Sequence, residues 1–254
     1  MFAGIDIGSR SIELVVVENS RVVHAARAAT TFDPVSQCHK LFDAAPACPV
    51  VATGYGRELA AANGFGREIT SITEIKAHAL GAAHRFPQAG GVLDIGGQDT
   101  KAIALLPGGK VAKFEMNDRC AAGTGKFLEF LANVFQIPVE EFGAYALSGT
   151  PGIEVSSMCT VFAETEATSL MAKGRDPKDI ALGLHASVVR RTANMLRRVG
   201  VADGITPVVF SGGVAHNPCI VHLLGQALGQ PLLVAHDPDM TGALGAALWG
   251  ERRG

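Results

Sequence analysis

Short apolar runs and longer helical patterns alternate along the chain. Strand-length apolar runs occupy residues 2–7, 12–17, 21–27 and 50–53, and a turn at Asn19-Ser20 joins the second to the third. Residues 73–85 have helical periodicity instead, with Ile75, Ala79 and Ala82 on one face. The first third of the chain therefore predicts a sheet that starts with a β-hairpin and is followed by a helix.

The opening pattern returns 88 residues later. Residues 91–95 form a strand, and the runs at 102–106 and 110–115 pair across a Pro-Gly-Gly turn. Asp6-Ile7-Gly8-Ser9 and Asp94-Ile95-Gly96-Gly97 each leave one strand and enter such a hairpin. This repetition predicts an internal duplication, with one subdomain over residues 1–88 and a second over residues 89–254. The C-terminal helix is expected to be able to pack back on the first.

The second half is richer in helix. Helices are predicted at 121–135, 161–173 and 176–199, strands at 206–210 and 232–235, and a last helix from about Thr241. No low-complexity segment or long linker interrupts the pattern. We therefore expect both halves to pack over one cleft.

Composition narrows the function classes. The 254 residues are 48% hydrophobic and include 30 glycines, which suits a well-buried α/β protein. The net charge of −2 and the lack of a basic block argue against nucleic acid binding. No run reaches the roughly 18–20 apolar residues of a membrane helix, and no signal peptide is recognisable. A cytosolic protein is expected, with its five cysteines present as thiols or metal ligands.

Three glycine turns follow buried strands, at Gly8-Ser9, Gly96-Gly97 and Gly212-Gly213. Glycine lets backbone amides approach an anion closely, because no Cβ intervenes. The strand-end carboxylates Asp6 and Asp94 can hold Mg²⁺ through water or orient an attacking water. One such turn is most often only a tight turn, but the duplicated pair and the third turn together predict a nucleotide phosphate site. Neither the Walker nor the Rossmann spacing occurs.

Two cysteines precede predicted helices: Cys120 in Asn-Asp-Arg-Cys-Ala-Ala-Gly-Thr-Gly and Cys159 in Ser-Ser-Met-Cys-Thr-Val-Phe-Ala-Glu. Iron–sulfur and structural zinc sites want about four protein ligands, which a two-fold dimer would supply. Core thiols or a redox pair are the alternatives. A helix beginning at Ala121 would direct its free amides at a negatively charged cluster on Cys120.

The duplicated turns resemble the actin, hexokinase and Hsp70 ATPase superfamily, in which two ribonuclease-H-like subdomains of an α/β fold clamp Mg-ATP. The resemblance implies that nucleotide-binding residues lie in two phosphate loops, in a loop on the adenosine side and at the start of the connecting helix. The first phosphate loop would contain Gly8, Ser9, Arg10 and Ser11, and the second would contain Gly96, Gly97, Gln98 and Lys101. The adenosine side would contain Gly212, Gly213, Val214 and Asn217, and the helix would start at Gly242.

The motifs Asp94-Ile-Gly-Gly-Gln-Asp, residues 116–127 around Cys120, and Cys159-Thr-Val-Phe-Ala-Glu are similar to those of the BadF/BadG/BcrA/BcrD ATPase family. That resemblance implies a homodimer with one [4Fe–4S] cluster, held by Cys120 and Cys159 of each subunit, and one Mg-ATP (or ADP) per subunit. An electron from ferredoxin or flavodoxin would pass at low potential to an iron–sulfur partner. The partner would be a 2-hydroxyacyl-CoA dehydratase, a benzoyl-CoA reductase or a double-cubane cluster protein.

The sequence departs from the family at one place, because Glu13 stands where the first phosphate loop usually has lysine, while Lys101 is kept in the second. Arg10 is a candidate substitute for the missing charge. Asp6 and Asp94 are the candidate catalytic carboxylates, together with Gln98, which would orient the attacking water or be a simple turn residue.

Two further positions have alternative interpretations. Glu164 would reach the ATP ribose or only favour a helix start. Glu74 and His78, one helical turn apart, favour a surface pair or a domain contact over a metal site. The rival functions are a small-molecule kinase of the same superfamily, acting on a sugar or carboxylate, and a non-enzymatic nucleotide-dependent clamp.

Overall fold

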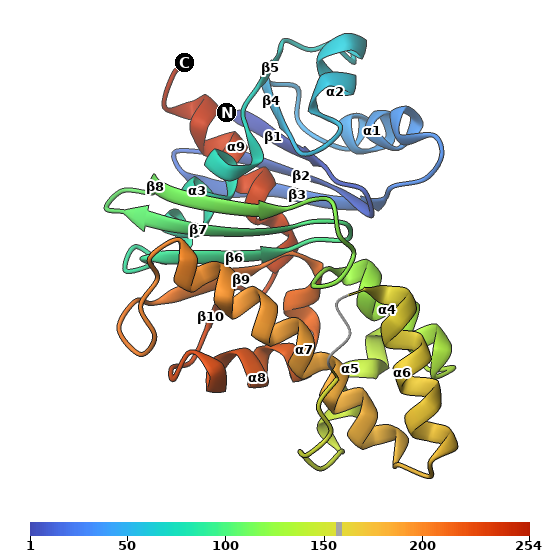
Figure 1. Ribbon diagram of the computed structural model, residues 1–254. Coiled ribbons are helices and arrows are strands. Elements are labelled where there is room, and N and C mark those ends of the chain that lie inside the picture. The colour runs from blue at the N-terminus through green and yellow to red at the C-terminus, as the bar shows by residue number, and fades with distance from the viewer. Residues whose placement is uncertain (156–158) are drawn as a thin grey trace.

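Two five-stranded sheets build the molecule in the computed structural model, which describes residues 1–155 and 159–254 (Figure 1). In the first sheet an antiparallel hairpin layer is extended by two parallel strands. Its order is β3-β2-β1-β4-β5, with β1 Phe2–Ile7, β2 Ser11–Glu18, β3 Arg21–Ala29, β4 Val50–Thr53 and β5 Ile69–Ser71.

The second sheet repeats this connectivity. Its order is β10-β9-β6-β7-β8, with β6 Gly91–Ile95, β7 Thr100–Leu106, β8 Lys110–Asn117, β9 Val208–Ser211 and β10 Leu233–Val234. The hairpin β6-β7-β8 is antiparallel and β9 and β10 are parallel to β6, as β4 and β5 are to β1. The predicted α/β fold with two duplicated subdomains is confirmed.

Helices α3 (Glu74–Arg85) and α9 (Thr241–Glu251) connect the two sheets. Ala82 of α3 packs with Val92 and Ile103 of the second sheet, whereas α9 packs on Val15 and Val17 of the first. The two helices cross where glycines face each other, because a Cβ on Gly81 would clash with the carbonyl oxygen of Thr241, and one on Gly245 with that of Ala77. This close crossing places the N-terminus of α9 beside the end of β1, where a Cβ on Gly242 would clash with Asp6 Oδ2.

The remaining helices cover the outer faces. Helices α1 (Pro34–Asp43) and α2 (Arg57–Asn63) pack on the first sheet, and α7 (Pro177–Arg198) and α8 (Pro218–Ala227) on the second. Helices α4 (Gly125–Val134), α5 (Val139–Leu147) and α6 (Thr160–Ala172) form a group at one end of the second sheet (Figure 1). The short 3-10 turns η1 (Gly213–His216) and η2 (Pro238–Met240) complete the chain. Within the described residues, no helix is long and apolar enough to cross a membrane.

One predicted helix start is wrong. The helix expected from Ala121 begins at Gly125, four residues later, and residues 121–124 form a turn in which the Thr124 amide donates to the Ala121 carbonyl at 2.9 Å. Gly123 has a φ of +95°, which an α-helix excludes and glycine tolerates. Cys120 therefore lies in a loop, separated from α4 by this turn.

Candidate functional site

The two hairpin loops have the same local structure. The amide of Gly8 donates to the carbonyl of Ser11 at 3.0 Å, and the amide of Gly96 donates to that of Asp99 at 3.0 Å. The loops also meet each other, since a Cβ on Gly97 would lie 3.1 Å from the Ser9 hydroxyl oxygen. The structure thus brings the two predicted phosphate loops together at one place between the sheets.

A second pair of turns follows the next strand in each half. Gly54 after β4 and Gly212 after β9 both have a left-handed backbone, with φ of +87° and +83°. A Cβ on Gly54 would clash with Asp6, and one on Gly212 would lie 2.9 Å from Asp94 Oδ1. Gly212 was predicted from sequence as part of the site. Its counterpart Gly54 was not assigned a role there, although the duplication of the strand pattern pointed to it.

The strand-end carboxylate of the second half has a full set of partners. Asp94 is buried, lies 3.4 Å from the Lys101 ammonium, and accepts a hydrogen bond of 2.9 Å from the Ser211 hydroxyl. Burial opposes ionisation of Asp94, but His78, Lys101 and the Ser211 hydrogen bond outweigh it and lower its pKa. Asp94 is therefore held as a carboxylate at the end of β6.

Lys101 is buried and shared among three carboxylates. Its Nζ lies 2.6 Å from Asp99 Oδ2 and 2.9 Å from Glu74 Oε2, besides the contact with Asp94. Burial opposes the charge of Lys101, but these three carboxylates outweigh burial and raise the pKa of the ammonium. The predicted nucleotide contact Lys101 is thus a fixed positive charge in the second half.

The carboxylate of the first half has different surroundings. Asp6 is buried against the first turn of α9, because a Cβ on Gly242 would clash with Asp6 Oδ2. Burial raises the pKa of Asp6 to about 6, although His78 opposes the rise. Glu13 lies opposite Asp6 in the β1–β2 ladder, where Lys101 lies opposite Asp94 in β6–β7. Burial, with the Asp6 charge beside it, raises the pKa of Glu13 to about 8.

His78 joins the two halves. Its Nδ1 lies 3.3 Å from Asp94 Oδ1 and its Nε2 lies 3.7 Å from Asp6 Oδ2. Glu74, one turn earlier on α3, binds Lys101. The structure therefore shows a domain contact, and not an exposed pair, at these two positions. Sequence reasoning did not include them in the site, although the Glu-His spacing on one helix face was a signal for them.

Several predicted nucleotide contacts are exposed or have partners outside this cluster. Arg10 is exposed and its guanidinium binds Glu129 of α4 at 2.7 Å, while Gln98 is exposed in the second loop. The side-chain oxygen of Asn217 accepts a hydrogen bond from the Ile220 amide at 3.0 Å and so caps the start of α8, and its side-chain nitrogen lies 3.1 Å from His185 Nε2. Glu164 lies on the second turn of α6, where its carbonyl accepts from the Thr168 hydroxyl at 2.9 Å.

The Cys120 loop is tied to the second phosphate loop. The first amides of α4 donate to that loop, Gly125 to the Gly96 carbonyl at 2.9 Å and Lys126 to the Gly97 carbonyl at 2.8 Å. The Thr100 hydroxyl donates to the Gly123 carbonyl at 2.7 Å. The expectation that the helix amides face Cys120 is wrong, because they face the glycine loop.

Cys159 occupies the position just before α6, as predicted. It is exposed, and the Ala163 amide donates to its carbonyl at 2.9 Å. The neighbouring Val161 and Phe162 are 63% and 67% exposed, which leaves an apolar surface beside the thiol. The preceding residues 156–158 of the cysteine motif lie outside the described part of the chain. Within that part, no group of three or more His, Cys, Asp or Glu residues is arranged to hold a metal ion.

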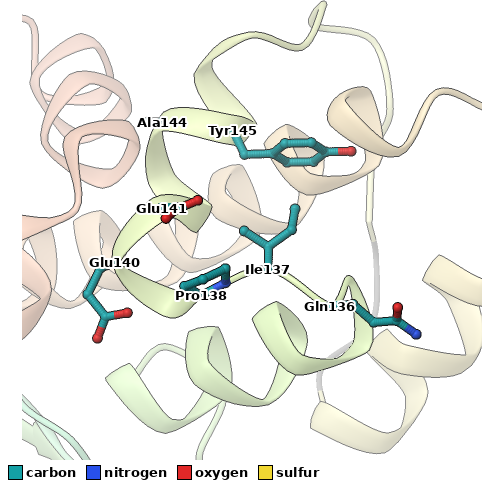
Figure 2. A pocket seen from close by; sticks show the side chains of 7 residues that line it. All are labelled: Gln136, Ile137, Pro138, Glu140, Glu141, Ala144 and Tyr145. Atoms are coloured by element: carbon teal, nitrogen blue, oxygen red, sulfur yellow. The ribbon is translucent and has the colours of Figure 1, made fainter.

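A surface hollow lies elsewhere. Figure 2 shows it on α5 and the turn before that helix, lined by Gln136, Ile137, Pro138, Glu140, Glu141, Ala144 and Tyr145. None of these residues belongs to a glycine turn or a cysteine loop. The hollow is therefore separate in sequence from the candidate site.

Comparison with known proteins agrees with the geometry. The family model for the BadF/BadG/BcrA/BcrD ATPase family matches residues 3–250. One subunit of the benzoyl-CoA reductase of Thauera aromatica is 32% identical, with 99% of this chain and 93% of that protein covered.

Two solved structures are similar over their whole length. Component A of the (R)-2-hydroxyglutaryl-CoA dehydratase of Acidaminococcus fermentans is 35% identical with a TM-score of 0.88, over 98% of this chain and 96% of that one. The activator of the 2-hydroxyisocaproyl-CoA dehydratase of Clostridium difficile, solved with bound ADPNP, is 35% identical with a TM-score of 0.85, over 98% and 93%.

Proposed function

Because the chain belongs to the BadF/BadG/BcrA/BcrD ATPase family, we propose that it is an activator that uses ATP to deliver electrons to an iron–sulfur enzyme. The acceptor would be a 2-hydroxyacyl-CoA dehydratase, a benzoyl-CoA reductase or a double-cubane cluster protein, and the donor a ferredoxin or flavodoxin. The names of the relatives, one from a reductase and two from dehydratase systems, support this class of acceptor.

The glycine loops fit Mg-ATP. Gly8, Gly96 and Gly97 carry no side chain where the two loops meet, so their backbone is accessible to a phosphate chain. Asp6 and Asp94 would hold Mg²⁺ through water, and the exposed Gln98 amide would orient the attacking water. Ser9, Arg10, Ser11 and Lys101 would contact the phosphates, and Gly212, Gly213, Val214, Asn217, Glu164 and Gly242 would surround the nucleoside.

One observation carries the proposed coupling of ATP to electron transfer. The amides of Gly125 and Lys126 at the start of α4 bind the carbonyls of Gly96 and Gly97, which belong to the second phosphate loop. A nucleotide that shifts this loop must therefore shift α4 or break two hydrogen bonds. The Cys120 loop ends at α4, so it follows the same movement. ATP changes the balance only if it binds one arrangement more tightly.

The two cysteines fit half of a cluster site. Cys120 is half-buried and Cys159 is exposed at the start of α6, beside the exposed Val161 and Phe162. A two-fold dimer formed on this surface would bring four thiolates together. The [4Fe–4S] cluster would supply the one-electron carrier, and the apolar side chains beside Cys159 would exclude water between the subunits.

Anaerobic purification tests this proposal directly. The wild-type protein is expected to be a brown dimer with about four iron atoms per dimer and broad absorbance near 400 nm. Cys120→Ser and Cys159→Ser should each lose the iron, whereas Cys48→Ser, a half-buried thiol on the first subdomain, should keep it. ATP binding should survive in all three variants, as measured by calorimetry.

A colourless, iron-free wild-type dimer would refute the cluster, and iron retained in Cys120→Ser would refute the ligand assignment. Transfer of the γ-phosphate to a small acceptor, with no reduction of an iron–sulfur partner, would refute electron transfer and favour the kinase.

A further inference from the structure

We propose that Asp6, Glu13 and Thr53 form a site for a divalent cation that binds without nucleotide and supplies the positive charge that Lys101 supplies in the second half. The proposal concerns the protein alone and does not depend on the iron–sulfur cluster or on the acceptor enzyme.

The strand registers place the three side chains together. Asp6 lies opposite Glu13 on one side and opposite Thr53 on the other, and residues directly opposite each other point to the same face of a sheet. In the second sheet, the same positions hold Asp94, Lys101 and Ser211. The two halves therefore present the same three positions, and the charge differs at one of them, which is Glu13 in the first half and Lys101 in the second.

The two halves differ in how these side chains are satisfied. Lys101 has three carboxylate partners, and Ser211 donates to Asp94. In contrast, Glu13 Oε1 and Thr53 Oγ1 have no hydrogen-bond partner among the described residues, although Glu13 is only 4% exposed and Thr53 is fully buried. Buried polar atoms in folded proteins nearly always have a partner. These two oxygens therefore indicate a bound group that lies next to Asp6.

Charge decides between water and a cation. Five carboxyl groups gather here, those of Asp6, Glu13, Glu74, Asp94 and Asp99, and the ammonium of Lys101 is engaged with the last three. Arg27 lies opposite Glu13 in the β2–β3 ladder, but its guanidinium binds Asp239 at 2.5 Å. Among the described residues, the ion-pair partner of Asp6 is His78, 3.7 Å away. A water molecule would satisfy the unpartnered oxygens without compensating the two carboxyl groups.

The ligand chemistry selects the cation. Two carboxylates and a hydroxyl are hard oxygen ligands, which suit Mg²⁺ or Mn²⁺ and disfavour soft metals. A lysine in place of Glu13 would supply the positive charge itself, as Lys101 does in the second half, and would remove the need for the cation.

Equilibrium dialysis against Mn²⁺ tests the site, using the full chain stripped with EDTA, free of nucleotide, at pH 8.0. We expect one tightly bound Mn²⁺ per chain in the wild type. Glu13→Gln and Thr53→Val should weaken this binding at least tenfold, and Glu18→Gln, the same change at the exposed end of β2, should leave it unchanged. Circular dichroism verifies that each variant is folded.

Glu13→Lys gives an independent test, because its ammonium should replace the cation and abolish Mn²⁺ binding in a protein that stays folded. Absence of bound Mn²⁺ in the wild type would overturn the proposal. Binding that Glu13→Gln and Glu13→Lys both leave intact would do the same, since the ion would then lie elsewhere.

Discussion

The two halves of the chain share a backbone but not a charge pattern. In each, a glycine amide closes the hairpin loop at 3.0 Å, and a left-handed glycine follows the parallel strand. Yet the residue opposite the strand-end aspartate is Glu13 in one half and Lys101 in the other. Glycine fixes the loop geometry through the backbone, so the side chains opposite can diverge without changing the fold. The second half carries its own counter-charge, and the first half depends on one brought from outside.

Removing the internal counter-charge should have the largest effect. Lys101→Met leaves Asp94, Asp99 and Glu74 without their shared ammonium, and breaking a buried ion pair in this way costs about 3–5 kcal/mol of unfolding free energy. Urea unfolding measures the loss. Lys110→Met, at the exposed first residue of β8, is the control and should change stability by less than about 0.5 kcal/mol. A similar small change for both would mean that Lys101 does not hold the second half together.

The sequence predicted the two duplicated halves well wherever their structure depends on local sequence pattern. Strand-length apolar runs and the repeated Asp-x-Gly turns identified the hairpins of both sheets, and the repetition made Asp6 equivalent to Asp94 and Glu13 equivalent to Lys101. It was less informative for contacts made by distant segments. His78 and Glu74 enter the site from α3, and Thr53 from β4, so the pattern of the phosphate loops did not assign them to the site.

The helix expected at 121–135 shows why local propensity failed at the Cys120 loop. Ala121 and Ala122 are strong helix formers, but Gly123 adopts a left-handed conformation. The α4 amides then bind the second phosphate loop, a tertiary contact that outweighs the propensity. Helices α1 and α5 are among those that the pattern did not predict. Both are short, and α1 starts with proline at its first position, which reads equally well as a loop.

A buried histidine in each half gives a second contrast. His78 lies between two carboxylates, whereas His185 on α7 has neutral partners, the Ala181 carbonyl and the Asn217 amide. Burial lowers the pKa of His185 to about 4, so folding favours its neutral form. This contribution is present above the unfolded pKa of about 6.5 and is lost as the pH falls towards 4.

We therefore expect the wild type to lose about 2 kcal/mol of stability through His185 between pH 7 and pH 5. Other groups also titrate between these pH values. The free energy of urea unfolding is therefore measured for wild type and for His185→Leu at both pH values, and the difference between the two proteins gives the contribution of His185. His236→Leu, at a fully exposed position, should follow the wild type. An unchanged pH slope in His185→Leu would exclude His185 as the source.

Changing the first half should stabilise the protein slightly. Glu13→Gln removes the carboxylate that faces Asp6 and keeps the shape of the side chain, so repulsion between the two groups disappears. Without divalent cation at pH 8.0, we expect a gain of about 1 kcal/mol in urea unfolding. Added Mg²⁺ should reduce this difference, because it stabilises the wild type alone. A destabilised Glu13→Gln protein in EDTA would mean that Glu13 has a partner that supports it.

The smallest expected effect concerns the exposed residues of the two loops. Arg10 occupies in the first loop the position of Gln98 in the second, and it binds Glu129 of α4 at 2.7 Å with 58% of its side chain exposed. Solvent screens such a pair, so a double-mutant cycle with Arg10→Ala and Glu129→Ala should give a coupling energy of about 0.5 kcal/mol. High salt should reduce it. With ADPNP bound, the coupling should vanish if the Arg10 guanidinium binds a phosphate group, because it then no longer binds Glu129. A coupling that persists unchanged would leave Arg10 as a link from the first loop to α4, and phosphate binding in the first half would then depend on backbone amides and the cation.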